Sequence, residues 1–154
     1  MTDTKAPEQQ FAIQRIYLKD ASLETPSGIT VFSSKWAPKV QLDVNTRAEK
    51  IGDDVHEVTL SLTVTATQDE KTVFLVEVQQ AGIFACKGLA GDQLRQVLTT
   101  MCPDILFPYA RETIDTFVVK ASFPALMLAP MNFDALFKQA LLQQQAQQAT
   151  AATH

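Results

Sequence analysis

Residues 58–67 alternate without exception between apolar and hydroxyl-bearing side chains. Successive side chains of a β-strand point to opposite faces of a sheet, whereas the apolar residues of a helix recur every three or four positions. The segment is therefore predicted to be a strand with one apolar and one polar face. Its apolar positions are Val58, Leu60, Leu62, Val64 and Ala66.

Three other segments have extended character. The apolar residues of 11–18 change parity halfway, as they would in a strand that contains a β-bulge. A second extended region starts near Ile29 and is clearest over 39–45, where apolar and polar residues alternate. A short polar connection after residue 67 leads to a fourth predicted strand at 72–80.

Helical spacing appears only after residue 90. Apolar residues recur at intervals of three and four over 94–101 and again over 114–118, and the two prolines between them are expected to interrupt or kink the helix. The uncharged stretch 121–133, which contains two more prolines, is predicted to be a loop. Asn132 is the expected N-cap of a last helix, whose apolar stripe is Leu136, Phe137, Ala140 and Leu141.

A run of strands followed by a run of helices is typical of an α+β fold. The order of elements predicts a four-stranded antiparallel sheet with C-terminal helices packed on one face. The length of 154 residues suits one domain. Residues 1–10 are predicted to form a flexible arm and residues 11–142 a single domain. Residues 143–154, rich in Gln, Ala and Thr, are predicted to form a disordered tail.

The charge distribution excludes some classes of partner. The net charge is −4, and residues 1–80 hold 12 of the 17 acidic and 8 of the 13 basic side chains. No basic face is evident, so the sequence predicts no binding to nucleic acid and favours a basic partner. Two cysteines, no secretory signal and no long apolar run predict a soluble cytoplasmic protein that does not insert into a membrane.

The inventory of chemical groups favours a protein that is not an enzyme. His56 lies among acidic residues, but without the spacing of a metal site. Cys86 and Cys102 have no CxxC partner and are interpreted as buried apolar residues. Glycine-rich phosphate loops and nucleophile elbows are absent from the sequence. We therefore predict no catalytic residue, no metal and no cofactor.

Several features remain that packing alone does not explain. Strand 72–80 is apolar on both parities, so it is either a central strand covered on both faces or a strand covered by a second subunit or partner. Asp20 and Glu24 are expected to share one strand face. The apolar loop at 121–133 and the segment around Trp36 indicate either a binding surface or a cap over the core.

Four local motifs give the sequence a specific resemblance. They are QRIYLKD at 14–20, VQQAGIF at 78–84, CPDILFPYARE at 102–112 and LAPMNFDALF at 128–137. They occur in order across the whole predicted domain. With these motifs the chain resembles the SecB family of bacterial protein-export chaperones.

The resemblance implies a function without catalysis. SecB proteins form homotetramers, as dimers of dimers, from subunits with a four-stranded antiparallel sheet and helices on one face. They bind unfolded secretory precursors, keep them unfolded and pass them to SecA, the export motor ATPase. Three alternatives remain outside export. They are a SecB-like chaperone dedicated to a toxin–antitoxin pair or another single partner, a small-molecule binder or enzyme that uses an apolar α+β cavity, and a structural subunit of a larger assembly.

The resemblance also assigns roles to residues. The SecA-binding surface of the family corresponds to Asp20, Glu24, Leu75 and Glu77. The client groove corresponds to Trp36, Val40, Leu42, Val44, Leu126, Phe137, Leu141 and Leu142. A tetramer would also cover the strand at 72–80, with candidate interface residues Phe74, Val76, Val78 and Gln80.

Overall fold

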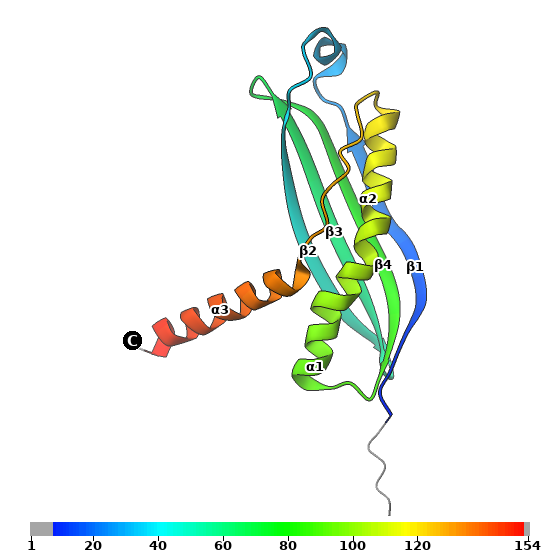
Figure 1. Ribbon diagram of the computed structural model, residues 1–154, viewed down its shortest axis with the longest axis vertical. Coiled ribbons are helices and arrows are strands. Elements are labelled where there is room, and N and C mark those ends of the chain that lie inside the picture. The colour runs from blue at the N-terminus through cyan, green and yellow to red at the C-terminus, as the bar shows by residue number, and fades with distance from the viewer. Residues whose placement is uncertain (1–7, 153–154) are drawn as a thin grey trace, which may run out of the picture.

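The computed structural model describes residues 8–152 and has one four-stranded antiparallel sheet, with strand order β1-β4-β3-β2 (Figure 1). The strands are β1 (Gln10–Glu24), β2 (Lys39–Gly52), β3 (Val55–Gln68) and β4 (Lys71–Lys87). The predicted α+β class and sheet are confirmed. Most of the arm predicted at 1–10 lies outside the described residues, and β1 begins at Gln10.

Helix α2 (Cys102–Lys120) packs on the face of the sheet formed by β3 and β4 (Figure 1). Every fourth residue of the helix is fully buried, in a row that contains Cys102, Leu106, Ala110, Ile114 and Val118. The sheet contributes the alternating apolar residues of β3 together with Phe74, Val76, Val78 and Phe84 of β4. Burial of each large aliphatic side chain contributes about 1.5–3 kcal/mol.

The helix before α2 is continuous through its first proline. α1 (Gly91–Gln96) leads into a π-helical turn (Val97–Met101), which leads directly into α2. Within the turn the N–H of Cys102 donates to the carbonyl of Val97, five residues back. Pro103 has no N–H, and its ring would crowd the carbonyl four residues before it, so a locally wider turn accommodates it. The predicted interruption is thus a π turn.

Two bulges shape β1. The register of β1 against β4 shifts between Ile13 and Arg15 and again between Leu18 and Asp20. The first shift is the predicted bulge, and the second has Lys19 as the extra residue. Because the second bulge adds one residue, Asp20 lies on the same face as Tyr17, three positions earlier, while Ala21 points to the core.

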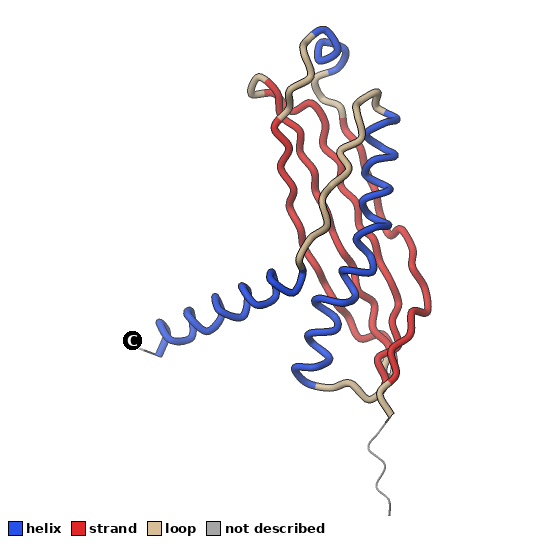
Figure 2. The backbone as a smooth tube through the Cα atoms, in the orientation of Figure 1, coloured by secondary structure: helices blue, strands red, loops and turns tan. Residues whose placement is uncertain are grey.

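Two connections differ from regular structure. Residues 28–33, which were expected to be extended near Ile29, form a 3₁₀ helix (Gly28–Ser33). Residues 121–132 form an irregular strap, as predicted, that runs over the sheet beside α2 (Figure 2). Buried aromatic rings anchor its two ends, Phe123 just inside the first and Phe133 just after the second.

The last helix, α3 (Phe133–Ala152), leads away from the sheet (Figure 1). Asn132 caps it as predicted, since its Oδ1 accepts from Ala135 N at 2.9 Å. The helix contacts the π turn, and Arg95 Nη2 donates to Gln144 Oε1 at 3.2 Å. Residues 143–152, predicted to be disordered, are helical because Ala and Gln have high helix propensity even where little apolar surface is buried.

The fold places the predicted subunit-interface residues on the core face of the subunit. Phe74, Val76 and Val78 lie beneath α2 and are at most 1% exposed, and Gln80 is 4% exposed and donates to Tyr17 O at 3.0 Å. The alternating pattern correctly placed these residues on one face of β4, and that face is turned towards the subunit's own core. Within the subunit these side chains belong to the core, and their part in a subunit interface stays a prediction.

Within residues 8–152, no helix combines the length and the apolar character that crossing a membrane requires.

Candidate binding surfaces on the two faces of the sheet

The four residues assigned to SecA binding gather on the face of the sheet opposite α2. Residues paired directly across antiparallel strands share a face. Glu24 pairs with Leu75, and in the next two rows Ser22 pairs with Glu77 and Asp20 with Gln79. The three carboxylates are exposed and Leu75 is half-buried. We call Asp20, Glu24, Leu75 and Glu77 the acidic surface.

The same rows continue across β3 and β2. Thr65, Thr63 and Ser61 of β3 follow, and then Gln41, Asp43 and Asn45 of β2. These three rows contain no Lys or Arg, so this part of the face is negative and otherwise neutral. Asp43 is a further carboxylate here that the sequence reasoning did not include. Its alternation with apolar neighbours was visible, but which strand lay beside it was not.

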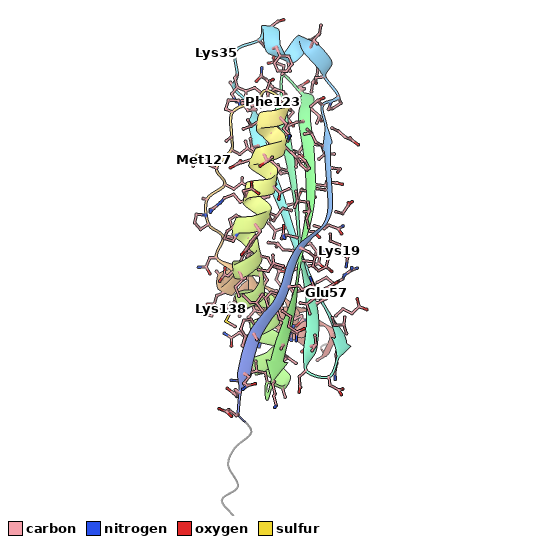
Figure 3. All side chains as sticks on the ribbon, turned by 90° about the vertical axis from the view of Figure 1, so that its right-hand side faces the viewer. Lys19, Lys35, Glu57, Phe123, Met127 and Lys138 are labelled. Carbon is pink, nitrogen blue, oxygen red and sulfur yellow. The ribbon has the colours of Figure 1, made fainter. Side chains whose placement is uncertain are left out.

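A cluster of polar groups bounds the acidic surface. The side chains of Lys19 and Glu57 lie close together (Figure 3), with Lys19 Nζ 2.6 Å from Glu57 Oε1. Tyr17 O–H donates to Glu57 Oε2. The hydrogen bond from Lys19, followed by that from Tyr17, lowers the pKa of Glu57. The same hydrogen bond to Glu57 is the main cause that raises the pKa of Tyr17. Tyr17 lies opposite the small residue Ala81 of β4, which leaves room for its ring.

Part of the predicted client groove forms an apolar strip on the α2 side of the sheet. Val40, Leu42 and Val44 share this face of the edge strand β2. Leu42, Val44, Leu126 and Trp36 are partly buried against the core, and Val40 is 42% exposed. The ring of Trp36 stacks on Phe123, with centroids 4.8 Å apart. We call Trp36, Val40, Leu42, Val44 and Leu126 the apolar strip.

The other three predicted groove residues lie on α3. The guanidinium of Arg95 lies 5.8 Å from the ring centroid of Phe137, and Leu141 is half-buried. Leu142 is 66% exposed. These side chains therefore belong to a helix that leads away from β2, and they do not join the apolar strip within the subunit.

Side chains of α2 hold the strap. Asp115 Oδ1 accepts from Leu126 N at 3.0 Å and from Met127 N at 3.2 Å, and Arg111 Nη1 donates to Leu128 O at 3.4 Å. Among residues 8–152, no backbone hydrogen bond joins 124–131 to a strand. Met127 has a φ of 50° and is 78% exposed (Figure 3). The backbone of residues 124–131 is thus held by side chains of α2 rather than by a strand of the sheet.

The buried groups with chemical potential are in unreactive settings. Burial raises the pKa of Cys102 to about 12 and also raises that of Cys86. Such thiols are poor nucleophiles because the thiolate is the reactive form. His56 is 8% exposed, and its Nδ1 has no hydrogen-bond partner. In the described part of the chain, no three His, Cys, Asp or Glu side chains converge as metal ligands would.

An acidic face and an apolar strip on opposite sides of one sheet define a binding protein of the α+β class. The family model described as preprotein translocase subunit SecB matches residues 4–145. The chain belongs to this SecB family of protein-export chaperones.

Curated relatives and a solved structure agree with this assignment. The protein-export protein SecB of Hahella chejuensis is 56% identical over 151 residues, which cover 97% of this chain and 95% of that protein. The SecB protein of Marinobacter nauticus is 56% identical over 92% of this chain and 86% of its own length. A SecB-like chaperone of Mycobacterium tuberculosis, solved with a peptide from the HigA1 antitoxin, matches with a TM-score of 0.58 at 17% identity. It covers 79% of this chain and 88% of its own and shares the fold.

Proposed function

We propose that this export chaperone binds unfolded secretory precursors on its apolar strip and delivers them to SecA through its acidic surface. It acts in the cytoplasm as a homotetramer, a dimer of dimers, and catalyses no reaction. It uses no cofactor, binds no nucleic acid and does not insert into the membrane. The observation that carries the proposal is the location of the two surfaces on opposite faces of one sheet, which lets client and motor bind at once.

Client capture follows from burial of apolar area. An unfolded chain exposes apolar side chains, and their burial against the apolar strip contributes about 25 cal/mol per Å². Such contacts carry no sequence code, so one strip binds any one segment weakly. Four strips of a tetramer bind one long chain with much higher avidity, because the later contacts are intramolecular. Slowly folding precursors stay exposed long enough to be captured.

Delivery follows from charge. The C-terminal zinc-binding segment of SecA is small and basic, and exposed carboxylates would steer and orient it. Leu75 adds an apolar anchor between Glu24 and Glu77. A chaperone dedicated to a toxin–antitoxin pair would need no such surface, so binding to the SecA segment distinguishes the two functions.

The test is a calorimetric titration of the full chain with one secretory precursor, presented unfolded and then folded. We expect binding to the unfolded form alone, at about one precursor per tetramer. Leu42→Ser should weaken client binding only, and Asp20→Lys should weaken SecA binding only. Failure of the wild-type chain to bind the unfolded precursor would contradict the chaperone proposal.

A further inference from the structure

We propose that Glu57 is a positioning residue for the acidic surface. It holds the ammonium of Lys19 away from Asp20, so that Lys19 does not neutralise a carboxylate that a basic partner would bind. The inference rests on the proposed function, in which the acidic surface binds a basic segment of SecA. It adds a residue outside that surface and gives it a distinct task.

The first step is the position of Lys19. It is the bulged residue of β1 and directly precedes Asp20, the first residue of the acidic surface. The three rows of that surface contain no Lys or Arg of their own. Lys19 is therefore the cation that directly neighbours a carboxylate of the acidic surface in the sequence. An exposed carboxylate attracts a neighbouring lysine by only about 0.2–1 kcal/mol, so a less solvated anion readily competes for it.

The second step is the competing anion. Glu57 lies two strands away on β3, and Lys19 reaches it across β4 with an N–O distance of 2.6 Å (Figure 3). Its side chain is 17% exposed, so the ion pair is less screened by water than a pair at Asp20 would be. Tyr17 donates to the second oxygen of Glu57, which fixes the orientation of the carboxylate. Glu57 is thus a preorganised acceptor, whereas Asp20 is freely exposed.

The third step concerns the other charges near Glu57, which include Arg15 of β1 in the same row, since Arg15 and Glu57 both pair with Ile83. Glu49 lies directly opposite Glu57 on β2, and Arg47 lies in the next row and further lowers the pKa of Glu57. Two carboxylates side by side would repel each other without nearby cations. Lys19 therefore has a stable site in this cluster. Removal of the charge on Glu57 takes away the carboxylate that Lys19 contacts and leaves Glu49 beside Arg47 of its own strand, so Lys19 returns to the acidic surface.

A purely structural clip between β1 and β3 would behave differently. Glu57→Gln keeps the side-chain length and an acceptor for Tyr17 O–H, but it removes the charge that holds Lys19. If the cluster served only stability, this variant would change the unfolding transition and leave partner binding unchanged. If Glu57 positions Lys19, partner binding weakens, and the loss depends on Lys19 being present.

The experiment uses the full chain and the zinc-loaded C-terminal segment of SecA as the probe, with four proteins: wild type, Glu57→Gln, Lys19→Gln and the double variant. We expect Glu57→Gln to bind about fivefold more weakly, as one neutralised surface carboxylate would predict. Lys19→Gln should bind at least as well as wild type, and the double variant should recover wild-type affinity. Binding of an unfolded precursor should be unchanged in all four proteins.

Two outcomes separate the inference from the proposed function. If wild type binds the segment and Glu57→Gln binds equally well, or the double variant stays as weak as Glu57→Gln, the inference is overturned and delivery to SecA stands. If wild type does not bind, the delivery step fails, and a crystal structure of Glu57→Gln decides the inference. In that structure Lys19 Nζ should lie within about 4 Å of the Asp20 carboxylate. A Lys19 ammonium that stays beside Gln at residue 57 overturns the inference.

Discussion

Glu24 at the end of β1 lies directly opposite Leu75 on β4, on the face of the sheet that α2 leaves open. A carboxylate and a half-buried aliphatic side chain thus stand side by side. Leu75 is not covered by α2, so part of its apolar surface stays open to solvent. The proposed SecA contact accounts for both residues, since charge would orient the partner and Leu75 would provide area to bury.

Leu75→Gln should weaken binding to the C-terminal segment of SecA by about tenfold, because a half-buried leucine contributes on the order of 1–2 kcal/mol when it is covered. Thermal stability and client binding should change little. Ile51→Gln is the control, since Ile51 is an aliphatic residue that is 50% exposed but lies beyond the acidic surface, at the end of β2. Equal losses in the two variants would indicate a general effect of surface hydrophobicity.

Deletion of Lys19 should be tolerated far better than deletion of Asn45. Both are exposed polar residues inside edge strands, but Lys19 is the extra residue of a bulge and Asn45 belongs to a regular ladder. Removal of a bulged residue leaves every other side chain on its face, whereas removal of a ladder residue moves one half of the strand to the opposite face. We expect a cost below about 2 kcal/mol for Lys19 and above about 3 kcal/mol for Asn45.

Urea unfolding of the two deletion variants measures this difference. Lys19→Ala serves as a control that removes the ion pair with Glu57 but keeps the bulge. Similar destabilisation by the two deletions would mean that β1 re-pairs after the deletion and that the bulge does not set the faces.

The two bulges of β1 show what the sequence could and could not reveal. The bulge at Gln14 was predicted because the apolar residues on either side of it change parity. The bulge at Lys19 was not, because Lys19 and Asp20 are both polar and leave no signal in an apolar pattern. That second bulge places Asp20 and Glu24 on the open face. Only the family resemblance connected them with Leu75 and Glu77 before the strand pairing was known.

Strand β4 shows a second limit of the sequence. The parity of Phe74, Val76 and Val78 follows from alternation alone, but whether α2 or another subunit covers them depends on tertiary packing. The sequence therefore suggested a subunit interface for residues that the subunit's own core covers, and the interface itself stays a prediction. The helical residues 143–152 show the opposite case, since a low apolar content suggested disorder where Ala and Gln favour a helix.

The stability of the chain should fall as the pH is lowered below 6.5. Burial, and then the nearby Lys50, lower the pKa of His56 from its usual 6.5, although Asp54 acts in the opposite direction. Well above pH 6.5 His56 is neutral in both the folded and the unfolded chain, so its ionisation does not lower the stability. Below 6.5 the unfolded chain binds the proton more readily, and stability is lost until the pH reaches the folded pKa, by up to about 1.4 kcal/mol per pH unit.

Urea unfolding at pH 7.5 and at pH 5.5 tests this expectation. His56→Gln should flatten the dependence over that range, whatever its effect on absolute stability. Glu57 does not interfere, because its lowered pKa affects stability only below its usual value of 4.5. An unchanged slope in His56→Gln would assign the titration to another group.

Asp115→Ala should release the middle of the strap without unfolding its ends. The carboxylate accepts from the amides of Leu126 and Met127, and hydrogen bonds to a charged group contribute about 1.5–3 kcal/mol each. Phe123 and Phe133 stay buried at the two ends. Amide hydrogen exchange should therefore become at least tenfold faster at residues 126 and 127 and stay unchanged in β3, since β3 does not contact the carboxylate. Asp115→Asn keeps an acceptor and should show a smaller increase.

Release of the strap in these variants would let Leu126 leave the apolar strip more often. Dissociation of an unfolded client should therefore be fastest from Asp115→Ala, slower from Asp115→Asn and slowest from wild type. Equal exchange in all three proteins would mean that the aromatic anchors alone position the strap.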